Sequence, residues 1–444
     1  MVIAIIFGQL IWVFDPWRFG GLYLIDYIPQ LIAACAVIPL LWTIGAVHAC
    51  LRERRGKLSW LLIAVRVIMI ILSLIAVYTL WTNPRQLLQL GFSFAAALAA
   101  VWADLIITDG LERRAFPGKG VIWSISSAVI LALLLWPTNY LVTYPGITMN
   151  MQRYVQVDDG HPQGEIAGVL IFQRPAFPVD WLYAAVFPHY TFEKQEELGM
   201  PLDQYNQMVR RMKHDANTIA AAIALEKAGL GRGVIHIGVL VIDVVKDGPA
   251  EGVLQPGDLI VGANDVEVHR TDELMQVISG LEPGDHLEVV VVREGETRHL
   301  TLQTAAREDD PTRPMAGIQI TDEVVYDVPL DIQYTQYLLH EGGPSHGGVL
   351  TLTIIDQLTP GGVTQGNYVA ATGTIRADGS IGPIGGIRQK AFTVARSGVD
   401  VFFVPAGQEE EARLGAKNLQ IVPVQTIDEI LEWLAQHAKQ TEDG

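Results

Sequence analysis

The sequence predicts a multi-domain protein in which an N-terminal α-helical transmembrane bundle precedes two α+β domains, the first of them rich in β-strands. The chain has 444 residues, which is more than one ordinary domain holds. Apolar runs long enough to cross a bilayer recur, and all of them lie within residues 1–145. The remaining residues alternate short β-like runs with segments of helical spacing, as layered domains do.

The charge divides at the same point of the chain. Residues 1–145 carry 10 Lys and Arg against 6 Asp and Glu, whereas the remainder carries 21 against 42. Nucleic-acid binding needs a basic footprint, so the acidic remainder argues against a nucleic-acid partner. Both cysteines, Cys35 and Cys50, lie in or beside an apolar run. We therefore expect no disulfide, no cysteine-based metal site and no cofactor in the soluble part.

Four segments of residues 1–145 have the roughly 20 apolar residues that a membrane span needs, so the lipid bilayer is an expected partner. They are residues 24–50, 58–82, 87–109 and 121–143. A further apolar segment, residues 2–14, is too short to span comfortably and lacks the features of a signal peptide. It is compatible with a fifth span, a re-entrant piece or an interfacial helix.

The loops between the spans predict the orientation. "LRERRGK" (51–57) has four basic residues and "GLERRAFPGKG" (110–120) has three. Positively charged loops face the cytoplasm, so the chain after about residue 144 is predicted to be extracytoplasmic, on a multi-pass protein of the plasma (inner) membrane. The opposite topology, with the soluble part in the cytosol, is the alternative.

Two charged residues, Arg66 and Asp104, fall inside predicted spans, where charge is costly. They can pair across two helices, or each can extend alone to the interface. No chain of ionisable residues crosses the predicted spans, which argues against a proton relay or transporter.

Residues 146–228 are predicted to be a mixed linker region that ends in a helix. The next segment, residues 229–306, is strand-rich, and its "DGPAEGVLQPGDLIVGANDVEV" resembles a PDZ domain of the kind found in bacterial proteases. The resemblance implies that an extended peptide adds to a sheet edge between Val239–Val245 and the helix that starts at Thr271. A candidate nest of backbone N–H groups lies in 231–238, so Gly233, Gly238 and Val239 are candidate binding residues. A spacer domain without a ligand is the alternative.

The chemistry is expected in residues 315–440, where "EGGPSHGGVL" places Ser345 at the start of a predicted helix. Helix N-termini favour developing negative charge, and small neighbours such as Gly343 and Gly347 let a substrate backbone come close. A serine nucleophile also needs a base. His346 is poorly placed, because adjacent helical residues point about 100° apart. Lys390, in "GPIGGIRQKAF", is the other candidate, since burial lowers the pKa of an ammonium group.

The set "GGPSHGG", "ATGTI" and "GPIGGIRQK" resembles the proteolytic domain of the Lon protease family. The resemblance implies that Ser345 is the nucleophile, that Lys390 is the general base of a Ser-Lys dyad and that Thr372 orients the lysine. Arg388 then occupies a non-catalytic basic position. His346 replaces a small residue of the family and is either a tolerated neighbour or a group that contacts substrate or modulates pH dependence.

These patterns together resemble the bacterial membrane-anchored PDZ-containing Lon-like proteases. The predicted function is ATP-independent hydrolysis of peptide bonds in extracytoplasmic or membrane-associated polypeptides, because the sequence contains no G-x-x-x-x-G-K-[ST] motif. The PDZ domain is expected to bind or regulate the polypeptide substrate. The resemblance also implies a homo-oligomer, a hexamer. The alternative is a catalytically inactive PDZ scaffold or adaptor at the membrane.

Overall fold

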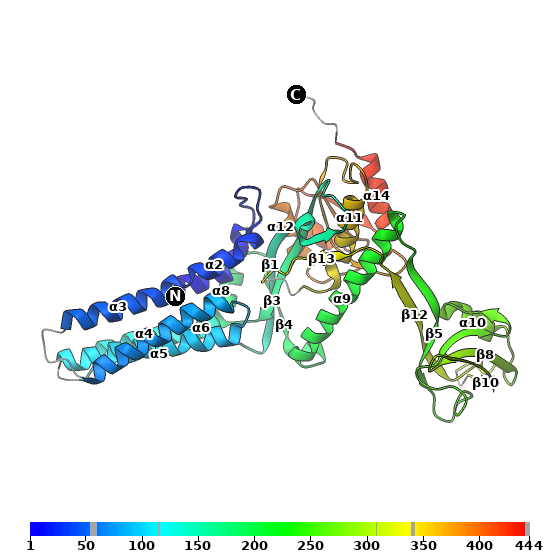
Figure 1. The fold of residues 1–444 in the computed structure, drawn as a ribbon, viewed down its shortest axis with the longest axis horizontal. Coiled ribbons are helices and arrows are strands. Elements are labelled where there is room, and N and C mark those ends of the chain that lie inside the picture. Colours follow the sequence, from blue (N-terminus) through cyan, green and yellow to red (C-terminus); the bar gives the residue numbers. More distant parts are fainter. Residues whose placement is uncertain (54–59, 114–115, 308, 339–341, 440–444) are drawn as a thin grey trace. The chain divides into compact units, whose positions relative to one another are not determined.

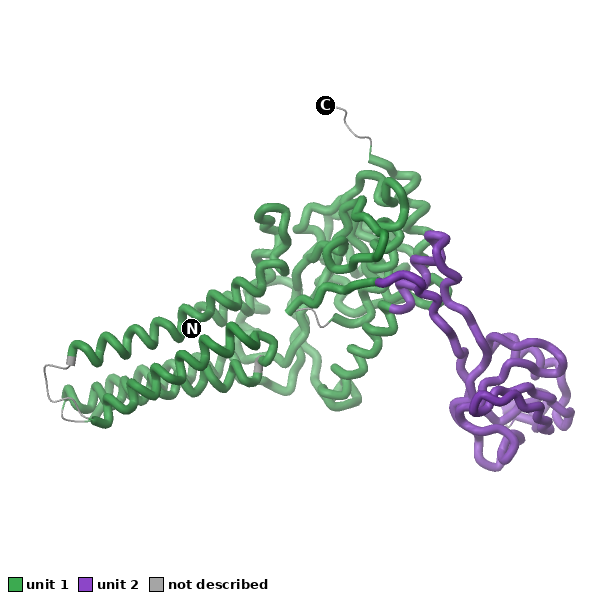
Figure 2. Tube along the Cα trace, in the orientation of Figure 1, with its two compact units in different colours: residues 1–217, 332–444 green, residues 218–331 purple. Residues whose placement is uncertain are grey.

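The computed structural model describes residues 1–444 except 54–59, 114–115, 308, 339–341 and 440–444. It divides into two compact units, which Figure 2 shows in different colours. Unit 1 contains residues 1–217 and 332–444, and unit 2 contains residues 218–331. A segment in the middle of the sequence therefore forms its own unit, and the residues on either side of it fold together.

The membrane helices belong to unit 1. Within the described residues, four helical segments are long and apolar enough to cross a membrane: Leu24–Arg52, Trp60–Thr82, Leu88–Arg113 and Gly118–Leu135. Consecutive helices of this set pack side by side (Figure 1). The helices are α2 (Ile28–Ala34) with a preceding 3-10 turn η2 (Leu24–Tyr27), α3 (Val37–Glu53), α4 (Trp60–Thr82), α5 (Leu87–Arg113) and α6 (Gly118–Leu135).

The last span is shorter than the sequence predicts. The expected range was 121–143, but α6 ends at Leu135, and residues 140–143 already belong to a β-strand. Pro137 lies directly after the helix, and proline cannot continue a helical hydrogen-bond ladder. Leu141 and Val142 are apolar because they are buried in the sheet of the soluble part, with 2% and 0% exposure.

Arg66 and Asp104 pair across two membrane helices. Arg66 Nε on α4 lies 2.8 Å from Asp104 Oδ1 on α5, and the arginine side chain is 2% exposed. Arg66 Nη2 also lies 3.4 Å from Thr108 Oγ1. The ion pair, rather than two independent side chains that extend to the interface, is therefore the arrangement that the fold adopts. Residues 54–59 and 114–115 of the basic loops lie outside the described residues.

Strands from both ends of the sequence form one six-stranded sheet in unit 1, in the order β18-β17-β14-β3-β1-β4. β14 pairs in parallel with β3 and β17, and β1 pairs antiparallel with β3 and β4. The strands are β1 (Tyr140–Asn150), β3 (Glu165–Pro175), β4 (Thr191–Lys194), β14 (Tyr368–Ala371), β17 (Val401–Pro405) and β18 (Gln420–Val424).

The region expected as a linker, residues 146–228, thus contributes central strands to this sheet. Ala167 and Val169 of β3 are buried in the same core as Ala391 and Phe402, which lie more than 200 residues later. Four consecutive residues of β3, 166–169, are buried in the sheet, which explains why the sequence is apolar there without being a membrane span. We infer that the fold containing β14 to β18 also includes residues 140–217.

Helices and short strands cover this sheet and connect its strands. They are η1 (Ile11–Phe14), α1 (Val2–Gln9), α7 (Met151–Tyr154), β2 (Val155–Val157), α8 (Pro178–Val186), η3 (Gln195–Leu198), α9 (Leu202–Lys227, which continues into unit 2), β13 (Ile332–Tyr334), η4 (Pro344–His346), α11 (Gly347–Leu358), β15 (Thr374–Ile375), β16 (Ile381–Gly382), α12 (Ile387–Ala395), α13 (Glu409–Gly415) and α14 (Ile427–Gln436). α12 packs on β1 and β3, and α11 contacts β2 and β15.

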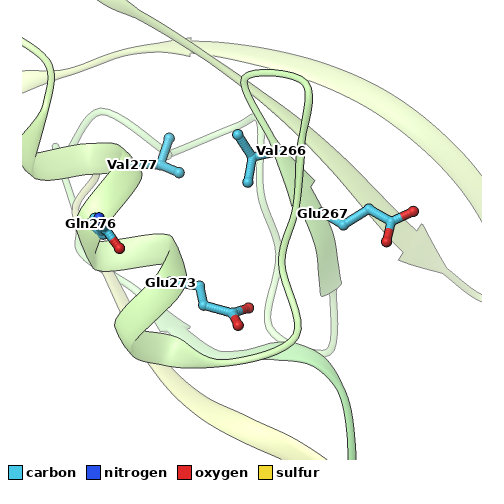
Figure 3. A pocket seen from close by; sticks show the side chains of 5 residues that line it. All are labelled: Val266, Glu267, Glu273, Gln276 and Val277. Atoms are coloured by element: carbon cyan, nitrogen blue, oxygen red, sulfur yellow. The ribbon is translucent and has the colours of Figure 1, made fainter.

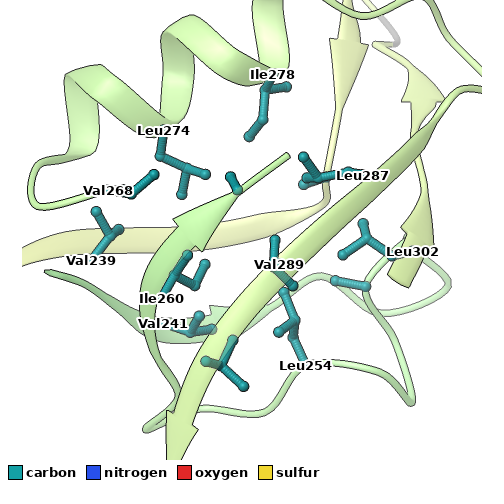
Figure 4. Packing of buried hydrophobic residues seen from close by; sticks show 14 residues of the cluster. Val239, Val241, Leu254, Ile260, Val268, Leu274, Ile278, Leu287, Val289 and Leu302 are labelled. Carbon is teal, nitrogen blue, oxygen red and sulfur yellow. The ribbon is translucent and has the colours of Figure 1, made fainter. Parts of the chain in front are cut away.

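Unit 2 is a β-sheet with one covering helix, α10 (Thr271–Ser279). The sheet order is β12-β5-β6-β8-β9. Its apolar core includes Val239, Ile260, Leu274 and Val289, all at most 1% exposed (Figure 4). The strands are β5 (Gly233–Val244), β6 (Leu259–Ala263), β7 (Val266–Glu267), β8 (His286–Arg293), β9 (Glu296–Gln303), β10 (Ala305–Ala306), β11 (Pro314–Met315) and β12 (Ile318–Asp327).

Strand β12 differs from the sequence expectation, which placed residues from 315 onward in the last domain. β12 pairs antiparallel with β5 from Ile318↔Val244 to Asp327↔Gly233. Ile318 and Ile320 pack against the core of unit 2. The apolar residues of this strand therefore complete the sheet of unit 2.

Candidate active site

Ser345 lies in a short turn that is held by backbone hydrogen bonds. η4 carries the serine directly ahead of the buried helix α11. Gly373 N donates to Ser345 O over 2.9 Å, and Gly348 N donates to Gly373 O over 3.1 Å. The loop after β14 thus forms backbone hydrogen bonds at Ser345 and at Gly348. These bonds fix the backbone that carries the serine hydroxyl group.

The structure brings the predicted Ser345, Thr372 and Lys390 together. Lys390 Nζ lies 2.7 Å from Ser345 Oγ and 3.1 Å from Thr372 Oγ1. Lys390 is 2% exposed and Thr372 is 3% exposed, whereas Ser345 is only half-buried. The amine is therefore shielded from water, while the hydroxyl stays within reach of a substrate.

Burial changes the protonation of the lysine. It lowers the pKa of the Lys390 ammonium group to about 7, because the desolvated charged form is disfavoured. A substantial fraction of the side chain is then the neutral amine near neutral pH. A neutral amine has a lone pair and can accept the proton of an adjacent hydroxyl group.

Thr372 determines which way that lone pair points. The Thr372 hydroxyl donates its proton to Ser345 O over 3.0 Å. Its oxygen can then only accept a hydrogen bond from Lys390 Nζ, because a hydroxyl group has one proton. With one N–H directed to Thr372, the amine is free to present its lone pair to Ser345 Oγ.

His346, the competing base, has both ring nitrogens next to groups other than the serine hydroxyl. Its Nδ1 lies 2.8 Å from Gly343 O, and its Nε2 lies 2.6 Å from Asn217 Oδ1 on α9. Burial lowers the pKa of the imidazole to about 4, so the ring is neutral at neutral pH. Because both ring nitrogens are engaged elsewhere, His346 ties the serine turn to α9 and is not placed to deprotonate Ser345.

The glycines of the site differ in what they do. Gly347 is buried, and a Cβ there would lie 2.5 Å from Ile375 Cγ2 and 2.9 Å from Ile375 N. Its small size is explained by the close approach of β15, so the structure does not support the expected contact with substrate. Gly343 is half-buried beside the serine turn, and its carbonyl is the group that His346 contacts. It remains accessible to a bound polypeptide.

The fold of unit 2 does not leave the predicted peptide-binding strand at a sheet edge. At Val239, β5 is paired with Asp322 of β12 on one side and with Ile260 of β6 on the other. Strand addition requires a free edge, so Val239 is not placed for it. β12 and β9 are the two end strands of this sheet, and α10 packs beside β12, where Thr271 N donates to Asp322 Oδ1 over 2.6 Å.

Gly233 and Gly238 are explained by packing rather than by a carboxylate nest. A Cβ at Gly233, which has φ +71°, would lie 2.1 Å from Glu226 Oε2. A Cβ at Gly238 would lie 2.7 Å from Ile260 O. The N–H of the preceding Arg232 donates to Asp327 Oδ2 over 2.7 Å. Packing accounts for both glycines, and a part for them in peptide binding stays a prediction.

A shallow pocket of unit 2 lies between α10 and β7. Figure 3 shows that it is lined by Val266, Glu267, Glu273, Gln276 and Val277. Glu273 already accepts hydrogen bonds from the N–H groups of His269 and Arg270, so it serves as the N-terminal cap of α10. Among the described residues, no group of three or more His, Cys, Asp or Glu side chains is arranged to hold a metal ion.

Comparisons with known proteins identify two domains of the chain. The family described as PDZ domain matches residues 206–304, and the family described as Lon protease (S16) C-terminal proteolytic domain matches residues 318–437. The chain therefore contains a PDZ domain and a proteolytic domain of the Lon protease family, behind four helices that can span a membrane. The predicted fold class and family resemblance are confirmed.

Individual relatives cover only part of the chain. A Lon protease of Metamycoplasma arthritidis is 30% identical over 24% of this chain and 13% of its own length. A Lon protease of Vibrio parahaemolyticus is 34% identical over 20% of this chain and 12% of its own length. The crystal structure of the PDZ domain of an SdrC-like protein from Listeria monocytogenes is 26% identical and covers 19% of this chain and 87% of that chain, with a TM-score of 0.18.

Proposed function

We propose that the protein is a membrane-anchored serine endopeptidase in which Ser345 and Lys390 form a catalytic dyad. The observation that carries the proposal is the 2.7 Å separation of Ser345 Oγ and a buried Lys390 Nζ. The Lon-type proteolytic domain supports a peptidase activity. The dyad adds a specific chemistry, which is acyl transfer through the serine.

The reaction begins when Ser345 Oγ attacks the carbonyl carbon of the scissile peptide bond and transfers its proton to Lys390 Nζ. Lys390 then gives that proton to the departing amine, which leaves an ester between Ser345 and the acyl part of the substrate. Water deprotonated by Lys390 attacks the ester and restores both groups. Thr372 keeps the lysine directed at Ser345 throughout, because it accepts the other N–H.

We propose that hydrolysis is independent of ATP, because the sequence has no phosphate-binding P-loop. Such an enzyme cuts polypeptides that are already extended or unfolded. We further propose that the PDZ domain binds an extended segment of the polypeptide along the outer edge of β12, beside α10, where backbone N–H and C=O groups supply hydrogen bonds.

The orientation and assembly are parts of the same proposal. The basic residues of 51–57 and 110–120 support a topology in which the soluble units lie outside the cytoplasm. Labelling a Lys417→Cys variant in intact cells with a membrane-impermeant maleimide tests this, and labelling only after lysis would reverse the topology. The family resemblance supports a hexameric homo-oligomer. Native mass measurement of the detergent-solubilised chain checks that number.

The test of the activity is hydrolysis of unfolded casein by the purified full chain in detergent without ATP. We expect cleavage by the unaltered chain and loss of at least 1,000-fold in Ser345→Ala and Lys390→Met, since the members of a nucleophile–base unit fail together. Ser397→Ala and Lys417→Ala are matched controls, because both residues lie away from the dyad. Cleavage by Ser345→Ala at the normal rate would refute the dyad. Casein binding without cleavage by the unaltered chain would favour the inactive scaffold.

A further inference from the structure

Three elements of unit 1 meet where the last membrane helix ends. Gln9, at the end of α1, donates from Nε2 to Leu134 O of α6 over 2.6 Å. Tyr183 of α8 donates from its hydroxyl group to Gln9 Oε1 over 3.0 Å. α1 and α8 are thus both bound to the last turn of α6, although 174 residues separate Gln9 from Tyr183.

The length of α6 determines how deep in the bilayer its contact with α1 and α8 lies. α6 has 18 residues, and at about 1.5 Å per residue it is roughly 27 Å long. The hydrocarbon core of a bilayer is about 30 Å thick, so a helix of this length ends at its boundary. An α6 that crosses the core therefore brings Leu134 and Leu135 to the boundary between acyl chains and headgroups, together with the parts of α1 and α8 that contact this end.

In α8 a charged side chain is buried and apolar side chains are exposed, the reverse of a helix on a water-exposed surface. Asp180, which is fully buried, pairs with Arg174 through two hydrogen bonds of 2.8 Å. The apolar side chains of Trp181, Leu182 and Val186 point outward instead, with 42%, 63% and 67% exposure. A contiguous exposed apolar face of this kind marks a contact with a membrane or another apolar partner.

The N-terminal segment has the same outward character. Ile3 is 83% exposed on α1, and the indole of Trp17 is 59% exposed. Rings follow one another in contact along this segment, with centroid distances of 5.0 Å for Phe7–Phe14, 5.3 Å for Phe14–Trp17 and 6.4 Å for Trp17–Phe19. Aromatic side chains, tryptophan above all, are enriched at the membrane–water interface.

The inner side of this segment is bound to the proteolytic domain. Trp12 is 2% exposed, and its ring lies 6.1 Å from that of Phe392 on α12. The carboxylate of Asp15 accepts hydrogen bonds from Thr148 N over 2.9 Å and from Thr148 Oγ1 over 3.0 Å. Arg396 of α12 donates to Val13 O over 2.6 Å. The outward side chains are therefore carried on a segment with a fixed position on the domain.

We propose that these outward side chains form a membrane-docking surface that inserts into the bilayer interface at the end of α6 and holds the proteolytic domain against the lipid. The surface, which we call the junction surface, consists of Ile3, Phe7, Trp17, Phe19, Trp181, Leu182 and Val186. It adjoins the end of α6, where Leu135 and Trp136 are 47% and 69% exposed, and this neighbourhood points to lipid rather than a soluble protein as its partner. The proposal does not depend on the catalytic activity.

The chemistry of this contact is apolar insertion rather than attraction to anionic headgroups. Arg18, between Trp17 and Phe19, is half-buried and donates to Thr148 Oγ1 over 2.7 Å, and the soluble part of the chain is acidic. Insertion of Trp, Leu and Val side chains gains from their removal from water, at roughly 25 cal/mol per Å² of apolar surface. The docking is therefore expected to persist in high salt and in vesicles of neutral phosphatidylcholine.

The experiment uses the full chain in phosphatidylcholine vesicles, with Cys35 and Cys50 replaced by alanine. An environment-sensitive NBD label is attached to a Leu182→Cys variant, and to a Phe19→Cys variant as an independent site. The matched control is Lys417→Cys. It lies ahead of β18, at the opposite edge of the sheet from β4.

We expect blue-shifted emission and quenching by lipid with a shallow doxyl group at positions 182 and 19, in 0.1 M and in 1 M salt. The label at position 417 should be unquenched. Emission at positions 182 and 19 that matches position 417 overturns the proposal. Oxidative cross-linking of Leu182→Cys between two copies, without lipid quenching, overturns it in favour of an interface between copies of this chain.

Discussion

Lys390 Nζ lies 2.7 Å from Ser345 Oγ, although the two residues are 45 positions apart in the sequence. The amine has no carboxylate partner among the described residues and is instead surrounded by the buried face of α12 and the loop after β14. A lysine in such a position is expected to be a proton acceptor rather than a structural cation.

The pH dependence of peptide hydrolysis should report this lysine. Its pKa is about 7, and only the neutral amine can accept the serine proton. We expect kcat/KM to rise through pH 7 and to fall about tenfold for each pH unit below 6. Initial rates on a fluorogenic peptide between pH 5.5 and 9 provide the measurement. A constant rate across that range would exclude Lys390 as the base.

The same pKa predicts an effect on stability. Because the folded-state pKa lies below the unfolded value of 10.5, the unfolded chain binds more protons between about pH 7 and 10.5. The free energy of unfolding should therefore rise with pH across that window. Lys390→Met should be more stable than the unaltered chain at pH 7 and should lose this slope. Denaturant unfolding at pH 7 and 9.5 tests both, and an equal slope in the variant would contradict the assignment.

Thr372→Val should lower kcat without preventing folding. The substitution keeps the shape of the side chain but removes the hydroxyl group that accepts from Lys390 and donates to Ser345 O. Loss of a buried hydrogen-bond partner costs about 1–3 kcal/mol, or roughly 5- to 150-fold in rate. Thr372→Ser, which keeps the hydroxyl group, is the control. Equal activity of the valine and serine variants would show that the hydroxyl group has no positioning role.

Substitutions of His346 should show which of its two ring nitrogens is needed for activity. In His346→Asn the amide nitrogen takes the place of Nδ1 next to Gly343 O, and in His346→Gln it takes the place of Nε2 near Asn217. Gly343 lies two residues before Ser345, so we expect the asparagine variant to retain more activity than the glutamine or alanine variants. A difference of about 2- to 10-fold in kcat corresponds to one neutral hydrogen bond. In all three variants the pH profile of activity should still fall on the acidic side with a midpoint near pH 7, because Lys390 is unchanged.

The ion pair of Arg66 and Asp104 should stabilise the packing of α4 on α5. Removal of one partner leaves an uncompensated charge among membrane helices, at a cost of about 3–5 kcal/mol. We expect Asp104→Leu to lower the unfolding midpoint in detergent more than the double variant Arg66→Met/Asp104→Leu does. If the double variant is as unstable as the sum of the single variants, the two side chains do not interact.

The sequence alone was sufficient for features that are encoded locally. Membrane spans follow from the length and polarity of continuous segments, and the predicted spans before residue 110 lie on the observed helices. Ser345, Thr372 and Lys390 each lie in a short glycine-containing motif, so the local sequence predicts the three residues that the fold brings within hydrogen-bond distance. The pairing of Arg66 with Asp104 was one of two alternatives, because residue spacing does not select a partner on another helix.

The tertiary structure decided which segments share a sheet and what each small residue accommodates. The apolar residues of β3 and β12 predict strands that are at least partly buried, but they do not specify which strands lie next to them. β3 pairs with β14 across the whole inserted PDZ domain, and β12 completes the PDZ sheet instead of the proteolytic one. Gly347 is required by the close approach of Ile375, which comes from another segment of the chain. Apolar patterns and glycine motifs in the local sequence predict which residues are buried and where the backbone turns. Contacts between distant segments form only when the whole chain folds, so the local sequence does not specify them.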